Sequence, residues 1–580
     1  MRPRAAGFDT VVTLWRHRTS STPDADGFYG KKDGSWHTIS WGAAGQRARA
    51  IACGLLALEL DKGQSCAIAC STRPEWILAD MGILCAGGAT TTIYPSATLH
   101  EWRHILADSG ARVCFVETRE QADRLLSQDL PDLQHIVVVD GRVGRHARIR
   151  SLEQLEREGR AWDAEHPGEW DQRADSVTPQ DVATIIYTSG TTGMPKGVVL
   201  THDNWIFEGE AMEKLGFMLT HDTHYLWLPL AHAYAKVLAL AGIRGGVPTA
   251  ADGNRKELLA NLQAIRPTVM AAVPRFFEKA WAEIERAAQR QGPVKRALFD
   301  RAMATGREMA TRREAGDPPG PLLGARWRFF DKTVYQPIRD QFGGKLRIFI
   351  SGAAPLNREL ALNFLGSGML ILEGYGLTES SAASLVNRPE RFRLGSVGHP
   401  LMGVKVRIAQ DGEVMLSGRG IMRGYHGQQD DRALSIEEGW LHTGDIGRID
   451  DQGSLTITGR KKELIITAGG KNLAPQPIEA KLSSQTEIAG AVVFGDRQPY
   501  LVALLQAEPD VTDREVQKAV DRVNRDLAHY AAIRSWARLP VPLSIEDGTL
   551  TPTRKLKRRV VTERYGDLVQ RLYLPLMETA

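Results

Sequence analysis

Residues 65–94, SCAIACSTRPEWILADMGILCAGGATTTIY, decide the fold class of this chain. The segment predicts a strand at Ser65–Cys70, a helix at Pro74–Ala86 and a second strand at Thr90–Tyr94. The alternation then continues with strands and helices predicted at Val113–Glu117, Ile136–Val139, Ala183–Thr188, His100–Ser109 and Glu120–Leu126. Near-continuous apolar strands separated by helices are typical of a parallel sheet covered on both faces. The sequence therefore predicts an α/β fold.

The pattern changes after about Gly395, where short strands are separated by tight turns. Residues 404–410 and 413–417 flank Asp411-Gly412, which is a strong hairpin signal, and residues 446–458 repeat the arrangement. We expect a small antiparallel β subdomain here. Residues 1–459 are predicted to form a large N-terminal domain of several subdomains, and residues 460–580 a small α+β domain.

One helix of the C-terminal domain is visible in the sequence. Apolar residues recur at helical spacing at Val516, Val520, Val523 and Leu527. Thr512 or Asp513 is expected to cap its N-terminus, because a short polar side chain can accept a hydrogen bond from the first free amides.

Composition excludes several classes of function. The 580 residues include 73 Lys and Arg against 69 Asp and Glu, and this net charge of +4 is too small to suggest a nucleic-acid partner. The N-terminus carries positive charge without an apolar stretch after it, and no window approaches 18 consecutive apolar residues. We therefore expect a cytoplasmic protein without a secretory signal or a membrane-spanning helix.

Two further features are interpreted structurally. The five cysteines form no CxxC pair, and Cys66 and Cys70 lie in a predicted apolar strand, so we expect buried thiols. Residues 281–317 predict a helical region that breaks at Gly292-Pro293. The segment Arg326-Trp-Arg-Phe-Phe330 after it can rest on the inner face of a membrane, or can be an ordinary helix with a buried aromatic face.

A loop rich in glycine and hydroxyl groups follows the strand predicted at residues 183–188. It reads Tyr187-Thr-Ser-Gly-Thr-Thr-Gly-Met-Pro-Lys-Gly197. The glycines let the backbone approach a ligand, and the hydroxyls and Lys196 can face phosphate oxygens. It is not a Walker loop, because Pro195 precedes Lys196 and Gly197 follows it. The segment predicts a polyphosphate cradle, with a flexible surface loop as the alternative.

This loop and five later motifs resemble the signatures of the adenylate-forming superfamily, which contains acyl-CoA synthetases, adenylation domains of peptide synthetases and luciferases. The later motifs, in the order of that family, are Ser351-Gly-Ala-Ala-Pro355, Tyr375-Gly-Leu-Thr-Glu379, Gly439-Trp-Leu-His-Thr-Gly-Asp445, Gly459-Arg-Lys-Lys-Glu463 and Leu550-Thr-Pro-Thr-Arg-Lys555. The resemblance implies a mobile C-terminal domain and a reaction that uses ATP, Mg²⁺ and coenzyme A.

The resemblance also implies which residues hold the nucleotide. They are Thr188, Ser189, Gly190, Thr192, Gly193, Lys196, Gly352, Ala353, Ala354, Tyr375, Gly376, Thr378, Asp445 and Arg460. Tyr375 would stack on the adenine ring, or would otherwise be a core aromatic residue. Asp445 would accept the ribose hydroxyls, because a carboxylate is an acceptor-only group. Arg460 resembles the second ribose contact.

Glu379 resembles the Mg²⁺ ligand of the family, with Thr191 as a second oxygen donor. Mg²⁺ keeps several waters and takes one or two protein ligands beside the phosphates of a substrate, so one carboxylate is enough. A solvated residue at a helix end is the alternative for Glu379.

Lys555 is expected to carry the adenylation step. Attack of a carboxylate on the α-phosphate brings two anions together, and an ammonium that bridges them lowers the barrier by positioning and electrostatics. The family commonly has Ser-Gly-Lys here, whereas this chain has Thr-Arg-Lys-Leu-Lys, which leaves Lys557 as a second candidate. His232 matches a family position beside the acyl pocket and the phosphates, and a structural histidine is the alternative.

A second half-reaction needs a thiol to reach the adenylate carbonyl. The resemblance implies that the C-terminal domain pivots near Lys462 after adenylation. Gly469 and Gly470, within Thr467-Ala-Gly-Gly-Lys-Asn-Leu473, would then leave room for the pantetheine arm of coenzyme A. The same segment can also be a turn between two elements of the small domain, and the two interpretations are compatible.

Three segments resemble bacterial long-chain acyl-CoA synthetases, namely Leu228–His232, Val273–Lys279 and Thr467–Pro475. An amino-acid-activating domain needs a buried Asp, and the pocket-side segment Leu370–Gly374 offers only Glu373, whose direction the sequence does not give. The resemblance therefore implies a medium-chain or long-chain fatty acid. Each buried methylene contributes about 0.8 kcal/mol, so the depth of an apolar tunnel would set the chain length.

Two other functions are compatible with the superfamily. A fatty acyl-AMP ligase loads an acyl carrier protein and carries an inserted segment after the Tyr-Gly-Leu motif, but here only Ser380–Leu394 separates Glu379 from Gly395. A catalytically silent nucleotide-binding relative would have lost Lys555, Glu379 or Asp445, and all three are present.

Overall fold

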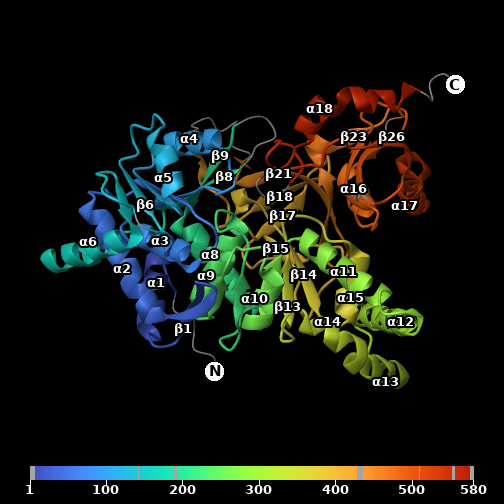
Figure 1. Cartoon of the computed structure of the whole chain (residues 1–580), viewed down its shortest axis with the longest axis horizontal. Coiled ribbons are helices and arrows are strands. Elements are labelled where there is room, and N and C mark those ends of the chain that lie inside the picture. The colour runs from blue at the N-terminus through green and yellow to red at the C-terminus, as the bar shows by residue number, and fades with distance from the viewer. Residues whose placement is uncertain are drawn as a thin grey trace.

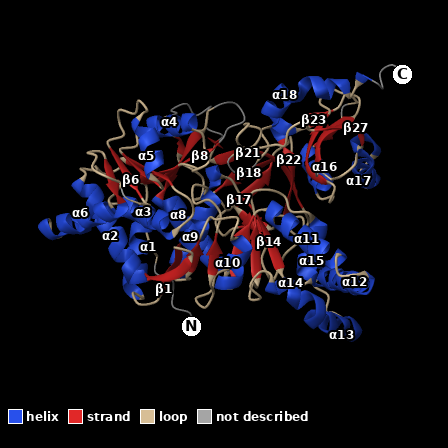
Figure 2. Cartoon of the chain, viewed as in Figure 1, coloured by secondary structure: helices blue, strands red, loops and turns tan. Residues whose placement is uncertain are grey.

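The protein is described by a computed structural model over residues 7–141, 143–188, 194–427, 436–469, 471–507, 510–551 and 555–574. A large body is joined to a smaller unit, which carries α16, α17 and α18 and lies at the upper right of Figure 1. Strands lie inside the large body and helices flank them, as Figure 2 shows. The predicted α/β fold with a small C-terminal unit is confirmed.

The first sheet has eight strands, and most of them come from the first third of the chain. Their order is β19 (Gly424–Tyr425), β9 (Lys196–Thr201), β8 (Val182–Thr188), β4 (Ala89–Thr92), β3 (Ser65–Ala69), β5 (Val113–Val116), β6 (His135–Val138) and β7 (Ile149–Ser151). The strands from β8 to β7 are parallel, whereas β9 and β19 are antiparallel to their neighbours. Every strand predicted in this region is present, with ends shifted by one or two residues.

Helices cover both faces of this sheet. In β3, Cys66 packs into one core and its neighbour Ala67 into another, as the alternation of side chains along a strand requires. The helices of this region are α2 (Trp41–Ala57), α3 (Pro74–Cys85), α4 (Leu99–Asp108), α5 (Arg119–Leu126), α6 (Leu152–Glu165) and α7 (Glu169–Asp175). Residues of α2 and α3 belong to the first core, and residues of α4 and α5 to the second.

The second sheet has nine strands and is parallel in its centre. Its order is β16 (His399–Pro400), β15 (Leu385–Val386), β14 (Leu370–Tyr375), β13 (Ile348–Ser351), β12 (Val269–Ala272), β10 (His224–Leu226), β11 (Thr249–Ala251), β1 (Asp26–Lys32) and β2 (Ser35–Ser40). The helices packed with it include α1 (Val11–Ser21), α8 (His202–Leu215), α9 (Ala233–Gly245), α10 (Leu258–Ile265) and α15 (Arg358–Gly366).

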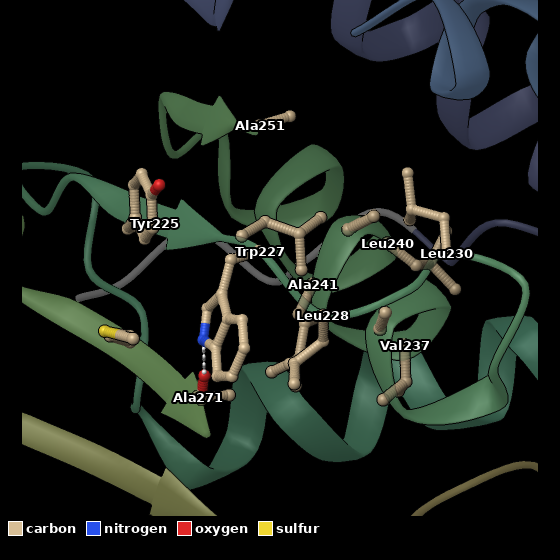
Figure 3. Packing of buried hydrophobic residues seen from close by; sticks show 14 of the residues in the cluster. Tyr225, Trp227, Leu228, Leu230, Val237, Leu240, Ala241, Ala251 and Ala271 are labelled. Carbon is tan, nitrogen blue, oxygen red and sulfur yellow. Dashed lines mark hydrogen bonds between the residues drawn. The ribbon is translucent and has the colours of Figure 1, made fainter. Parts of the chain in front are cut away.

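Figure 3 shows how the core around this sheet is packed. Trp227, which directly follows β10, is 8% exposed and donates its indole N–H to the carbonyl of Ala271 on β12, at 2.9 Å. Because β12 supplies this backbone acceptor, the indole N–H forms a hydrogen bond inside an apolar core. Leu228 and Leu230 lie beside α9 and lead into its N-terminus.

A helical arm projects from the large body at the lower right of Figure 1. It consists of α11 (Pro274–Gln289), α12 (Pro293–Ala315), α13 (Pro321–Phe330), a π-helical turn at Asp331–Tyr335 and α14 (Gln336–Asp340). The predicted break at Gly292-Pro293 is confirmed, because Gly292 has a φ of 83° and α12 begins at Pro293. The helical region begins earlier than Trp281, since Pro274 already occupies the first helical position of α11.

The predicted antiparallel subdomain is confirmed as a five-stranded sheet. Its strands are β17 (Lys405–Ile408), β18 (Glu413–Ser417), β20 (Ile436–Glu437), β21 (Trp440–Ile449) and β22 (Leu455–Arg460). Asp411-Gly412 makes the turn between β17 and β18, and Gly412 has a φ of 85°, which a residue with a side chain rarely adopts.

The C-terminal unit has its own hydrophobic cores, made of residues from Ile465 onward. Its elements are β23 (Ile465–Ile466), β24 (Asn472–Leu473), α16 (Pro475–Ser483), β25 (Ile488–Phe494), β26 (Leu501–Ala507), α17 (Asp513–Arg525), β27 (Ile533–Arg538) and α18 (Arg558–Arg571). Thr512 caps α17 and forms a capping box with Glu515, so the predicted cap is confirmed. Leu527 lies just beyond the helix and packs partly buried against this core.

Candidate active site

Two adjoining cavities lie where the large body meets the C-terminal unit. The first has a volume of about 1270 Å³ and the second about 1970 Å³. Residues predicted for the site that line the first are Thr188, Lys196, His232, Gly352, Ala353, Tyr375, Gly376, Thr378, Glu379, Arg460, Lys462 and Lys555. Ala354 and Asp445 line the second cavity, which shares Tyr375, Arg460 and Lys555 with the first. Motifs far apart in the sequence therefore meet at one place.

Asp445 joins two other predicted nucleotide residues. It is buried, its Oδ2 accepts a hydrogen bond from the Tyr375 hydroxyl at 2.7 Å, and its Oδ1 accepts one from Nε of Arg460 at 2.9 Å. Asp445 and Arg460 face each other across the register of β21 and β22. Burial, followed by the Asp445 carboxylate, raises the pKa of Tyr375 well above its ordinary value. A carboxylate, a phenol and a guanidinium together suit a ligand that carries hydroxyl groups and a flat ring.

Glu379 lies half-buried in the turn after β14. Its Oε1 accepts a hydrogen bond from the Tyr425 hydroxyl at 3.0 Å, and its backbone carbonyl accepts the N–H of Met422 at 2.8 Å. Lys196 lies over the ring of Tyr425, with its Nζ 5.2 Å from the centroid. Tyr425 therefore joins the predicted metal ligand to the lysine at the end of the glycine-rich loop.

The middle of the glycine-rich loop lies outside the described residues. This applies to Ser189, Gly190, Thr191, Thr192 and Gly193. The two ends of the loop contact helix α4, because the Tyr187 hydroxyl donates to Asp108 and the Pro195 carbonyl lies 2.9 Å from Nε2 of His104. The strand before the loop and the strand after it are paired as β8 and β9.

Lys555 enters the first cavity from the C-terminal unit. Its backbone N–H donates to Oγ1 of Thr551 at 2.9 Å, and its carbonyl accepts the Thr551 N–H at 2.8 Å. Lys555 is exposed to solvent and lines this open cavity. Desolvation, followed by the positive charge of Arg460, lowers the pKa of Lys555, while Asp445, Glu379 and Glu463 oppose this change. Lys557, the second candidate, lines only the second cavity.

His232 is the N-terminal cap of α9. Its Nδ1 accepts the N–H of Tyr234 at 3.1 Å, so the neutral ring carries its proton on Nε2. Burial, followed by the charge of Lys555, lowers the pKa of His232 to about 3. The histidine is therefore neutral at physiological pH. It caps α9 and also lines the cavity near Lys555.

Glu373 points toward the backbone of neighbouring loops. It is buried, its Oε1 accepts the N–H of Gly395 at 2.9 Å, and its Oε2 accepts the N–H of Leu356 at 3.3 Å. Burial raises the pKa of Glu373 to about 7. The orientation of the Glu373 side chain, which the sequence did not give, is therefore set by these two backbone amides beside the second cavity.

The linker after Arg460 is held by two carboxylates that the sequence did not single out. Nζ of Lys461 lies 2.5 Å from Oδ2 of Asp411 and 3.0 Å from Oε2 of Glu413. Glu413 is buried and also accepts the N–H of Gly444 at 2.8 Å. We refer to Asp411, Glu413 and Lys461 as the linker clamp. Lys462, the predicted pivot, is the next residue and is exposed.

The predicted path for the thiol is not at the site in this structure. Gly469 is exposed and lines neither cavity, and Gly470 lies outside the described residues. The backbone N–H of Thr467 donates to the carbonyl of Lys471, which closes a turn. The structure therefore brings Lys555, and not Gly469, to the nucleotide residues.

The first cavity has an apolar part beyond the polar residues. It is lined by Ile105, Ile186, Met212, Phe217, Val237, Leu238, Ile350 and Val386. These side chains come from α4, β8, α8 and the residues just after it, α9, β13 and β15, so the apolar part lies between the two large sheets. Burial of alkyl groups there is favourable by about 25 cal/mol per Å² of surface.

No described group of three or more His, Cys, Asp and Glu side chains is arranged to hold a metal ion. Among the described residues, none donates a hydrogen bond to Oε2 of Glu379, whereas Oε1 accepts one from Tyr425, which fits a cation that also binds substrate phosphates. The five cysteines are buried, and none of the described helices is long and apolar enough to cross a membrane.

Two family models match this chain. The model of the family described as AMP-binding enzyme matches residues 15–426, and that of the AMP-binding enzyme C-terminal domain matches residues 462–576. The chain is 34% identical to the long-chain-fatty-acid–CoA ligase FadD15 of Mycobacterium bovis, over 97% of each chain. It is 32% identical to the long-chain-fatty-acid–CoA ligase ACSBG1 of Homo sapiens, over 94% of this chain and 82% of that one.

Solved structures share the fold. The anthranilate CoA ligase AuaEII in complex with anthranoyl-AMP superposes with a TM-score of 0.74 at 19% identity, over 96% of this chain and 97% of that one. The adenylation domain of a carboxylate reductase from Mycobacterium chelonae superposes with a TM-score of 0.75 at 20% identity, over 98% and 92% of the two chains.

Proposed function

Because this chain belongs to the AMP-binding enzyme family, we propose that it is an ATP-dependent ligase that joins a fatty acid to coenzyme A. The acid first attacks the α-phosphorus of ATP, which gives an acyl-adenylate and releases pyrophosphate. The thiol of coenzyme A then attacks the acyl carbonyl, which gives the thioester and releases AMP. The names of the relatives at 32–34% identity support a long-chain acid.

The placement of Lys555 supports the adenylation step more than any other observation. Lys555 shares one cavity with Tyr375, Glu379 and Arg460, and an apolar part of the same cavity lies beyond them. An ammonium at this place can neutralise the repulsion between the carboxylate of the acid and the α-phosphate, without a proton transfer. The acyl chain would occupy the apolar part.

The proposed roles of the remaining residues follow from their contacts. Asp445 and Arg460 hold the ribose hydroxyls, Tyr375 stacks on the adenine, and Gly352 and Ala353 leave space for the ring. Glu379 would hold Mg²⁺ with the phosphates, and Thr191 remains a proposed second ligand. When bound, Mg²⁺ neutralises phosphate charge. His232 is neutral and borders the same cavity.

The second step requires another arrangement of the chain. We place the domain boundary at residues 459 and 460 and the pivot near Lys462, so that rotation removes Lys555 and brings in Gly469 and Gly470. The separate cores of the C-terminal unit support such a rigid rotation. Two glycines without side chains would leave a narrow passage for pantetheine.

Coenzyme A is the proposed acceptor, and an acyl carrier protein is the alternative. The test is to incubate the protein with ATP, Mg²⁺ and laurate, together with either coenzyme A or a holo-carrier protein. The proposal predicts AMP release and an acyl-CoA thioester in the first case. Acylation of the carrier alone would overturn the choice of acceptor, and no acid-dependent ATP–pyrophosphate exchange would overturn the ligase itself.

Helix α13 supports a peripheral contact with an anionic lipid surface. Leu322 and Phe329 on this helix are 76% and 62% exposed, and Arg328 and Lys332 beside them are also exposed. Apolar side chains flanked by cations are the pattern of interfacial helices. Sedimentation with vesicles that contain phosphatidylglycerol tests this contact, and a Phe329→Asp variant that binds the vesicles as well as wild type would contradict it.

A further inference from the structure

Glu208 is a buried carboxyl group that forms no ion pair with any described residue. It lies on α8, is 0% exposed, and neither of its oxygens has a hydrogen-bond partner within the described part of the chain. A carboxylate removed from water without a compensating charge is so costly that the group takes up a proton instead. Burial accordingly raises the pKa of Glu208 well above its ordinary value, although the nearby N–H of Ala383 partly opposes this. Burial therefore favours the neutral, protonated form of Glu208.

The carboxyl group of Glu208 lies against two loops that border the site. A methyl group added to Gly420 would lie 3.3 Å from Oε1 of Glu208 and 3.1 Å from the ring of Phe207, so Gly420 packs directly on this part of α8. The second loop is the turn that contains Ala383, whose amide faces the carboxyl. Glu208 thus fills the space between the two loops and the helix.

The two loops are tied to each other and to Glu379. Oγ of Ser381 donates to the carbonyl of Gly420 at 2.6 Å, and the N–H of Met422 donates to the carbonyl of Glu379 at 2.8 Å. Asn204, one turn before Glu208, donates to the carbonyls of Arg419 and Ile421 at 2.6 and 3.1 Å. Helix α8 therefore supports the segment that holds the backbone of Glu379.

The turn after Glu379 is strained. Ser381 and Ala382 have φ values of 61° and 102°, a region that residues with side chains rarely adopt. Such conformations persist only where the surroundings impose them. The buried side chain of Glu208 packs against this turn. The size and the neutral form of that side chain therefore help to determine the position of the turn.

We propose that Glu208 is a positioning residue that acts through the 381–383 turn and Gly420 to set the position of the Glu379 carboxylate. This inference rests on the proposed function, in which Glu379 is a ligand of Mg²⁺. Glu208 does not touch the metal or the substrate. Its effect is expected in the Mg²⁺ dependence of adenylation, because supporting residues behind a metal ligand commonly change metal affinity by about 10- to 100-fold.

The test compares Glu208→Ala and Glu208→Gln in fatty-acid-dependent ATP–pyrophosphate exchange over a range of Mg²⁺ concentrations. Calorimetric binding of ATP with and without Mg²⁺ gives a second readout that does not depend on turnover. Glu208→Ala is expected to raise the half-saturating Mg²⁺ concentration about tenfold, with a smaller effect on the rate at saturation. Glu208→Gln, which keeps the size and the neutral charge, is expected to restore wild-type Mg²⁺ dependence. Glu156→Ala is the control, because Glu156 is a buried carboxylate on α6 that pairs with Arg47 and lines neither cavity.

The outcomes separate this inference from the proposed function. A wild-type protein without acid-dependent exchange would refute the ligase. An active wild type whose Mg²⁺ dependence is unchanged in a folded Glu208→Ala variant would refute the positioning role, and so would an equal loss in Glu208→Gln. Should Glu208→Ala not fold, Gly420→Ala tests the same contact from the opposite side. It is expected to raise the half-saturating Mg²⁺ concentration, and a folded variant with wild-type Mg²⁺ dependence would contradict the proposal.

Discussion

Arg460 at the end of β22 and Lys555 in the C-terminal unit line the same cavity, and the charge of Arg460 helps to lower the pKa of Lys555. Two cations held close together repel each other unless an anion lies between them. The acidic residues in the neighbourhood offset this only partly. The arrangement therefore fits a polyphosphate ligand, whose negative charge would relieve the repulsion.

Replacing Asp445 tests the proposed ribose contact. Asp445→Asn removes the charge that pairs with Arg460 and weakens the acceptor for the Tyr375 hydroxyl. Since a hydrogen bond to a charged group contributes about 1.5–3 kcal/mol, the KM for ATP should rise about 10- to 100-fold. Steady-state kinetics with varied ATP measure this. Asp450→Asn is the matched control, because Asp450 lies in the same β subdomain but lines neither cavity; an equal effect in both variants would contradict the assignment.

Loosening the linker clamp should slow adenylation without unfolding the protein. Lys461→Met removes the ion pairs with Asp411 and Glu413, so the C-terminal unit would hold Lys555 at the cavity less often. Glu413 is buried, but the Lys461 end of both pairs is exposed, and such pairs contribute at most about 1 kcal/mol, so the exchange rate should fall about two- to fivefold. Lys405→Met changes an exposed lysine of the same subdomain and should have no effect. A wild-type rate in Lys461→Met would show that the clamp does not bear on this step.

Acid should destabilise the protein through its buried histidines. Burial lowers the pKa of His224 to about 3, and the group is fully buried with Nδ1 near Thr249. A histidine with a lowered folded-state pKa binds fewer protons in the native state, so stability is complete above pH 6.5 and falls as the pH decreases toward 3. At pH 4.5 the destabilisation from this histidine alone would be on the order of 3 kcal/mol.

The measurement is urea denaturation of wild type and His224→Asn between pH 7 and 4. The variant is expected to be less stable than wild type at pH 7 but to lose less stability as the pH decreases. Parallel losses in the two proteins would show that His224 does not contribute to the acid sensitivity.

The fold was predictable because its strands are short apolar runs with helices between them. Ser65–Cys70 and Val113–Glu117 became β3 and β5 with one residue less each, since the chain turns away from the sheet at its polar ends. The start of α11 was missed, although Pro274 is a helix-start signal. The aromatic side chains of Phe276 and Phe277 in that first turn pack against the core through tertiary contacts that spacing does not reveal.

Residues of the candidate site were predictable only where they belong to a recognisable sequence motif. Tyr425 contacts Glu379 and Lys196, and Glu413 contacts Lys461, yet neither pair is close in sequence. Long-range pairing of strands brings these residues together, so neither periodicity nor local motifs predict the contacts between them. Glu208 is the extreme case, because a charged residue on a helix normally indicates a solvated face, whereas the packing of α8 buries it completely.

The most direct test of the account separates the two half-reactions in Lys555→Ala. Acyl-adenylate formation is measured as fatty-acid-dependent ATP–pyrophosphate exchange, and thioester formation is measured from supplied acyl-AMP and coenzyme A. The account predicts that the variant loses the first activity and largely keeps the second, because Lys555 stabilises charge only while the acid joins the α-phosphate. Equal loss of both activities, or exchange at the wild-type rate, would contradict it.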